Sequence, residues 1–79
     1  MNMTLEEMNV GQTGKVIGFA RGAKAYREKL LAMGLTKGTQ FVVKRVAPLG
    51  DPVEINVRGF ALSLRKDEAA ALRVEKEDS

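Results

Sequence analysis

The chain has 79 residues, with thirteen basic and ten acidic side chains that give a formal net charge of +3, and it contains neither cysteine nor histidine. This length has room for one hydrophobic core, so we expect a single domain over residues 1–79, with its folded part over about 5–74 and a frayed tail over 75–79. The composition excludes disulfides, thiolate or imidazole catalysis, and the usual zinc, copper and haem ligand sets. No stretch approaches the roughly 20 apolar residues of a membrane span, so we expect a cytoplasmic protein without direct membrane insertion.

The chain opens with a short turn and a first strand. Thr4 is placed to cap a turn that directs Leu5 and Met8 inward. The β-branched and aromatic residues of 15–19 then predict a strand, in which Gly18 suggests a close approach of another backbone.

A helix is predicted over 23–33. Tyr26, Leu30 and Met33 recur at steps of four and three residues, which is the helical period. Gly34 follows directly and suits the left-handed position that closes a helix. The helix is therefore an insertion between the first strand and the next.

The rest of the chain predicts four more strands joined by short turns. A β-branched run covers 39–46, and the alternating segment 53–65 reads as a hairpin that turns at Arg58–Gly59. Asp67 is placed to cap a single helical turn before a last strand over 72–75. Five short strands laid flat would expose long edges, so we expect a mainly β fold with one inserted α-helix, closed into a small five-stranded barrel.

Three segments resemble the FeoA-type proteins of bacterial ferrous iron transport in order and spacing. They are Tyr26–Leu35 with Gly38, Arg45–Ile55 and Leu62–Lys66. The resemblance implies an SH3-like barrel and a non-enzymatic cytoplasmic accessory protein. It also implies action through protein–protein interaction with FeoB, the membrane ferrous iron transporter. A similar module forms the carboxyl-terminal domain of iron-dependent repressors, and a stand-alone relative of that domain is an alternative.

No residues of the chain suggest a cofactor or an iron site of its own. Histidine and cysteine are missing and the carboxylates are scattered, whereas a defined iron site needs clustered ligands. The link with iron that the resemblance implies is therefore expected to pass through the partner protein.

The inserted helix supplies one set of candidate partner contacts. Tyr26, Leu30 and Met33 would line a groove between the helix and the barrel, with Arg27 on its rim. Core packing is the alternative for these apolar residues, since helical apolar stripes usually face inward. A further hypothesis has Arg27 reach the nucleotide site of a partner, where a guanidinium can stabilise charge during phosphoryl transfer.

The proline-bounded loop over 48–52 supplies a second set. Leu49 is an apolar residue at the tip of a rigid loop, which favours docking at small entropic cost. Asp51 is a candidate contact as well, although a short acidic side chain in a turn also commonly bonds to the backbone of its own loop.

Binding of RNA is the competing function, because Gly11–Val16 resembles the glycine-bounded opening of small RNA-binding barrels. Such barrels combine clustered basic residues with exposed aromatics. Here the basic residues are dispersed, and Phe19, Phe41 and Phe60 are expected in the core. We therefore expect no nucleic-acid partner, and a monomer or weak oligomer.

Overall fold

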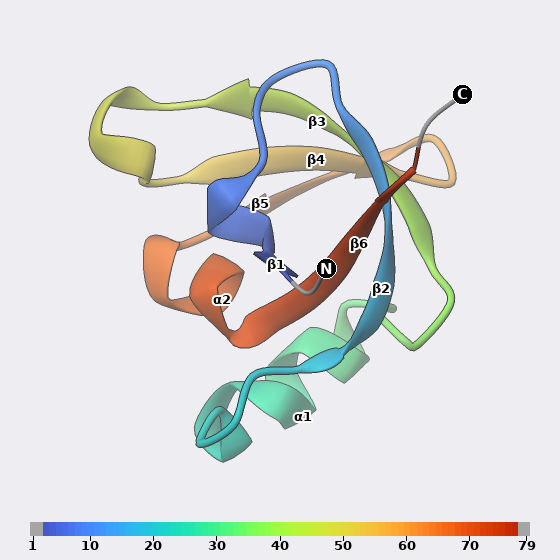
Figure 1. Ribbon diagram of the computed structural model, residues 1–79, viewed down its shortest axis with the longest axis vertical. Helices are drawn as coiled ribbons and strands as arrows, with labels where there is room; N and C mark the ends of the chain where they lie inside the picture. The colour runs from blue at the N-terminus through green and yellow to red at the C-terminus, as the bar shows by residue number, and fades with distance from the viewer. Residues whose placement is uncertain (1–2, 78–79) are drawn as a thin grey trace.

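The computed structural model describes residues 3–77 and shows one curved antiparallel sheet with helices at its borders (Figure 1). The elements follow in the order β1 (Met3–Thr4), η1 (Leu5–Glu7), β2 (Thr13–Phe19), α1 (Lys24–Ala32), β3 (Gln40–Val46), η2 (Pro48–Gly50), β4 (Val53–Val57), β5 (Phe60–Leu64), α2 (Lys66–Ala71) and β6 (Leu72–Glu77). Across these residues, no helix has the length and apolar character needed to cross a membrane.

The strands lie in the order β1-β6-β2-β3-β4-β5, and all neighbouring pairs are antiparallel. The predicted mainly β fold with one helix inserted after the first long strand is confirmed. The predicted number of five strands is wrong, because the described part of the sheet has six. The additional strand is β1, where Met3 pairs with Val74 and Thr4 pairs with Arg73.

The core lies inside the curve of the sheet. Its largest fully buried side chains come from nearly every element: Leu5, Val16, Leu30, Leu35, Val43, Val53, Ile55, Leu64, Leu72 and Val74. The alternation predicted for the hairpin is confirmed in β4, where Val53, Ile55 and Val57 are buried and the two residues between them are half-buried.

Helix α1 ends as its sequence predicts. Gly34 takes a left-handed conformation with φ of 88°, and its N–H donates to the carbonyl of Leu31 at 3.0 Å. The N–H of Leu35 donates to the carbonyl of Leu30, also at 3.0 Å. This pair of bonds is the Schellman motif, and it folds Leu35 back into the core.

The carboxyl-terminal end departs from the prediction of a frayed tail. Strand β6 continues to Glu77, with Lys15 opposite Glu75, Gly14 opposite Lys76 and Thr13 opposite Glu77. Pairing with β2 satisfies the backbone groups of a segment whose charged side chains suggested a solvated end. Residues 78 and 79 of the predicted tail lie outside the described part of the chain.

Three local predictions are wrong in their side-chain detail. Thr4 precedes η1 but its side chain makes no capping bond, and Arg65 rather than Asp67 precedes α2. The α2 start is instead held by Glu68, whose Oε1 accepts the N–H of Arg65 at 2.8 Å. At Gly18 an added Cβ would meet open space, so no other part of the chain approaches this glycine closely. Gly18 lies instead at a bulge in the β2–β6 pairing.

Candidate partner-docking site

The loop between β3 and β4 presents the most exposed large apolar side chain among the described residues. Leu49 is 92% exposed and has φ of 67°, a left-handed conformation that costs a residue with a Cβ about 1–2 kcal/mol. The loop is closed by two backbone bonds, from Gly50 N–H to the Ala47 carbonyl at 2.9 Å and from Ala47 N–H to the Pro52 carbonyl at 3.0 Å. The hydrogen-bonded backbone of the loop thus holds the apolar Leu49 side chain in an exposed position.

Asp51 holds this loop against the neighbouring helix. Its Oδ1 accepts the backbone N–H of Lys66 at 3.1 Å, and Lys66 is the first residue of α2. A carboxylate is favourable at this end of a helix because the first N–H groups have no partner within the helix. The structural interpretation of Asp51 therefore gains support, with a bond to α2 in place of the bond within the loop that the sequence suggested.

The predicted contacts on α1 divide into buried and accessible residues. Leu30 is fully buried, so its core-packing interpretation holds and it cannot touch a partner in this structure. Tyr26 and Met33 are half-buried and pack against the core. Arg27 is exposed, and its guanidinium carbon lies 5.8 Å from the centroid of the Phe19 ring, within cation–π range. That contact directs the Arg27 side chain along the barrel.

The two predicted contact surfaces do not merge. Figure 1 shows α1 at one end of the molecule and the loop between β3 and β4 at the other. Leu49 and Asp51 therefore form one candidate surface, and Tyr26, Arg27 and Met33 form another. A single partner would have to span the molecule to touch both.

Phe60 is the exposed aromatic that sequence reasoning missed. It was expected in the core but is 73% exposed, because it begins β5 at the edge of the sheet. Its neighbours Val57, Ala61 and Leu62 line a hollow of about 340 Å³ together with Met33 and Arg58. The alternating pattern predicted the strand correctly, but it does not indicate that this strand lies at the edge of the sheet.

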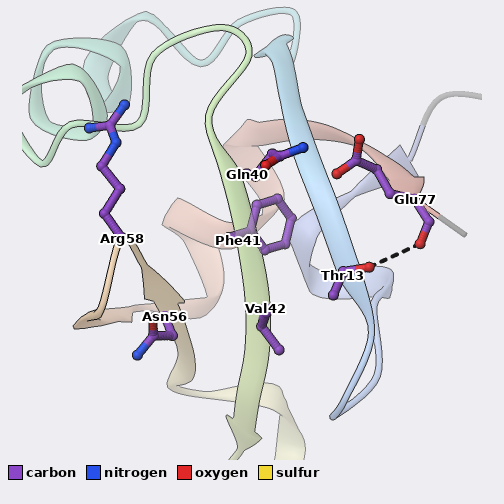
Figure 2. Close-up of a pocket in the computed structure, with 7 residues that line it drawn as sticks. All are labelled: Thr13, Gln40, Phe41, Val42, Asn56, Arg58 and Glu77. Carbon is purple, nitrogen blue, oxygen red and sulfur yellow. Dashed lines mark hydrogen bonds between the residues drawn. The ribbon is translucent and has the colours of Figure 1, made fainter. Parts of the chain in front are cut away.

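A wider hollow of about 470 Å³ lies over β2, β3 and β4 (Figure 2). Its floor is the buried ring of Phe41, and on one side the Thr13 hydroxyl donates to the backbone carbonyl of Glu77 at 3.0 Å. Figure 2 shows Arg58 on the opposite side of Phe41 from Glu77. Among residues 3–77, the one acidic and the one basic side chain that line the hollow are therefore kept apart, which does not favour acid–base chemistry there.

One ion pair joins the two α-helices. Glu68 of α2 is 3% exposed, and its Oε2 pairs with Lys29 Nζ of α1. Burial raises the pKa of the Glu68 carboxyl, but the hydrogen bonds from Lys29 and the Arg65 backbone and the attraction of both positive charges outweigh it. The net effect is a pKa below the ordinary value, so Glu68 is a charged structural link.

Within residues 3–77, no three carboxylates gather into a group that could hold a metal ion. The chain has no histidine or cysteine to supplement them.

The sequence model of the FeoA domain matches residues 3–76. The chain belongs to the FeoA family. It is 33% identical over 73 residues to an Fe(2+) transport protein A/Fe(2+) transporter FeoB fusion protein of Porphyromonas gingivalis. The match covers 92% of this chain but only 8% of the fusion protein.

Solved structures of FeoA proteins share the fold of this FeoA domain. A FeoA-like protein from Clostridium acetobutylicum superposes with a TM-score of 0.86 at 37% identity, covering 99% of this chain and 90% of that one. A protein described as an iron uptake regulatory protein (FeoA) gives 0.83 at 32% identity, covering 98% and 99%. A manganese-dependent transcriptional repressor gives 0.86 at 16% identity, covering 96% of this chain and 37% of the repressor, which shows a common fold alone.

These comparisons confirm the SH3-like FeoA fold and the family that the sequence motifs indicated.

Proposed function

We propose that this FeoA domain acts by docking onto the cytosolic side of a FeoB-type ferrous iron transporter. The observation that carries the proposal is the Porphyromonas gingivalis homologue, in which the matching segment belongs to a fusion with FeoB. A covalent fusion holds two modules at a high effective concentration. Where FeoA and FeoB are separate chains, a complementary surface must hold them together.

The loop that carries Leu49 is the docking surface we favour. Its side chain is almost fully exposed, and the two backbone bonds of the loop and the Asp51–Lys66 bond restrict its movement before any partner arrives. A pre-ordered apolar side chain loses little conformational freedom on binding. Docking also gives a functional reason for an apolar residue with left-handed geometry at this position.

Tyr26, Arg27 and Met33 form the second candidate surface. Their exposed parts could contribute a weaker contact at the opposite end of the domain. The Phe19 ring beneath Arg27 holds the guanidinium against the barrel, so no contact in the structure favours the hypothesis that this residue reaches a nucleotide site.

Co-purification with the FeoB of the same organism tests the proposal. Leu49→Asp places a charge at the exposed tip and should reduce the recovered complex at least about tenfold. Val10→Asp is the matched control, because Val10 is another exposed apolar residue, 59% exposed, in a turn away from the loop. Thermal melting must show that both variants fold. Equal recovery of FeoB with the parent and Leu49→Asp would refute docking through this loop.

The competing RNA function predicts a different result in the same samples. Phosphate contacts make affinity fall steeply with salt, so RNA that co-purifies and is released between low and moderate salt would favour it. Recovery of FeoB without such RNA supports the accessory role.

A further inference from the structure

Strand β5 forms an open edge of the sheet. Within the described residues no strand lies beyond it, and it pairs with β4 in a regular register from Val57–Phe60 to Val53–Leu64. In a hairpin with a two-residue turn the closing pair exchanges both hydrogen bonds, and bonded pairs then alternate along the ladder. The N–H and C=O groups of Ala61 and Ser63 therefore point away from β4, toward the open edge.

This edge lacks the features that usually block pairing with another chain. Proteins protect such edges with charged side chains, proline, bulges or very short strands. The segment Phe60–Leu64 contains no charge and no proline, and its pairing with β4 has no bulge. The opposite edge of the sheet, β1, has only two residues. The β5 edge is thus open to an added strand.

An apolar hollow runs beside the open edge. It measures about 340 Å³ and is lined by Met33 of α1 and by Val57, Phe60 and Leu62 among others. Phe60 is 73% exposed. An extended segment paired with β5 would place alternate side chains on this side of the sheet, where an apolar side chain can cover the Phe60 ring.

The charges around β5 favour an acidic occupant over a second copy of the chain. Arg58 borders the hollow at one end of β5, it is exposed, and no carboxylate of residues 3–77 lies within 4.0 Å of its guanidinium nitrogens. Arg65 and Lys66 follow the other end, where the Asp51 carboxylate also lies, and Glu54 stands opposite Ser63 on β4. The unpaired charge that borders the hollow is therefore that of Arg58. In the register centred on Leu62, two antiparallel copies would bring Arg58 of one opposite Lys66 of the other, and like charges facing each other are unfavourable.

The backbone of Arg58 supports a role for its charge. Its φ of 52° is left-handed, at a turn position where asparagine is the preferred residue. The chain therefore carries a strained arginine where asparagine, aspartate or glycine would be more favourable, and such strain is often found at functional sites.

We propose that the β5 edge and its hollow bind an extended segment of a partner protein, which has alternating apolar residues and an acidic residue that reaches Arg58. The segment adds a strand through Ala61 and Ser63, covers Phe60 with an apolar side chain and pairs its carboxylate with the guanidinium. The Arg58 and Phe60 end of this surface lies at the opposite end of β5 from the Leu49 loop, and its test does not require that the partner be FeoB.

A fluorescein-labelled synthetic peptide tests the proposal, with valine and threonine alternating between terminal aspartates. Fluorescence anisotropy measures its binding to the full chain. Ser63→Pro removes one outward N–H and leaves the β4–β5 hydrogen bonds intact, so it should weaken peptide binding at least about tenfold. Ser63→Ala is the control: it keeps the N–H and should change the affinity for the peptide less than about twofold. Ala61→Pro provides a second proline variant if Ser63→Pro does not fold.

Two further variants test the charge and the apolar contact. Arg58→Asn removes the charge while suiting the turn, so it should leave the melting temperature unchanged or higher and weaken binding about three- to tenfold, with a smaller dependence on salt. Phe60→Ser should also weaken binding. The proposal fails if the labelled peptide shows no binding at millimolar parent protein, if folded proline variants bind like the parent, or if a peptide with terminal lysines binds equally well. Sedimentation showing a dimer that Ser63→Pro dissociates would assign the edge to a second copy and overturn it.

Discussion

The ion pair between the two α-helices gives a prediction that can be worked out in some detail. Lys29→Met removes the ammonium group and keeps an unbranched apolar side chain of similar length. Glu68 then remains 3% exposed and keeps the N–H of Arg65 at 2.8 Å, but it loses its charged partner. Breaking a fully buried ion pair costs about 3–5 kcal/mol. Because the Lys29 side chain is 60% exposed and water screens the pair, we expect a loss of about 1–2 kcal/mol at pH 7.

For a domain of this size, each 1 kcal/mol lowers the melting temperature by about 4–8 °C. The loss for Lys29→Met at pH 7 should therefore be roughly 5–15 °C, seen by thermal melting and by urea unfolding. Lys24→Met is the matched control, since Lys24 is an exposed lysine of the same helix without an ion pair in residues 3–77. It should melt within about 2 °C of the parent.

The pH dependence separates this electrostatic effect from altered packing. In the parent, the pKa of Glu68 lies below its ordinary value of 4.5, because the contacts of Lys29 and the Arg65 backbone outweigh the burial that raises it. A lowered carboxyl pKa stabilises the fold fully above the ordinary value, and the contribution is lost as the pH falls through the folded pKa. The difference between parent and Lys29→Met should therefore shrink toward pH 3. An equal difference at pH 7 and pH 3, or none at pH 7, would refute the reasoning.

Three further predictions concern the core, the end of α1 and iron. Leu30→Ala should destabilise the fold by about 2–5 kcal/mol in urea unfolding, because Leu30 is fully buried, and an effect below about 1 kcal/mol would contradict its core position. Gly34→Ala should cost about 1–2 kcal/mol from left-handed strain alone, since an added Cβ meets nothing within 4 Å, and Gly34→Asn should recover part of the loss. Anaerobic calorimetry of the tag-free protein should detect no tight, stoichiometric Fe(II) binding, and a one-to-one heat of binding would overturn the assignment of iron chemistry to the partner.

Much of the fold follows from short-range signals in the sequence. Gly34 after the helical stripe predicted both the end of α1 and the return of Leu35, because few residues other than glycine take the left-handed closing position at low cost. The hairpin at Arg58–Gly59 was also predicted correctly, since alternation on both sides fixes the register. Such features are decided by neighbours in the chain, so a single sequence carries them.

Strand β1 and the last residues of β6 could not be predicted in the same way. Met3 and Thr4 pair with residues about seventy positions away, and Lys76 and Glu77, which lie beyond the predicted last strand, pair with β2. A two-residue strand is too short to show a pattern, and lysine and glutamate are depleted in strands, so each segment is ordered by backbone bonds to a partner strand. Charged residues at a chain end suggested a solvated tail because the sequence does not show which backbone groups will find partners.

The residues of the candidate site show the same difference between features decided locally and features decided by the rest of the fold. Leu49 was correctly predicted to be exposed, because the prolines around it define a loop from local chemistry alone. The predicted exposure of two residues was wrong. Leu30 was a candidate partner contact but is buried, and Phe60 was expected in the core but is exposed. Both belong to regular apolar patterns, and such a pattern specifies which residues share a face, not how much of that face the rest of the fold covers. The helical stripe is covered because α1 packs on the core, whereas β5 ends the sheet and leaves Phe60 in water. In a barrel this small, the order of the strands therefore determines which apolar residues stay exposed. The sequence does not show that order, so the β5 edge could be identified only from the structure.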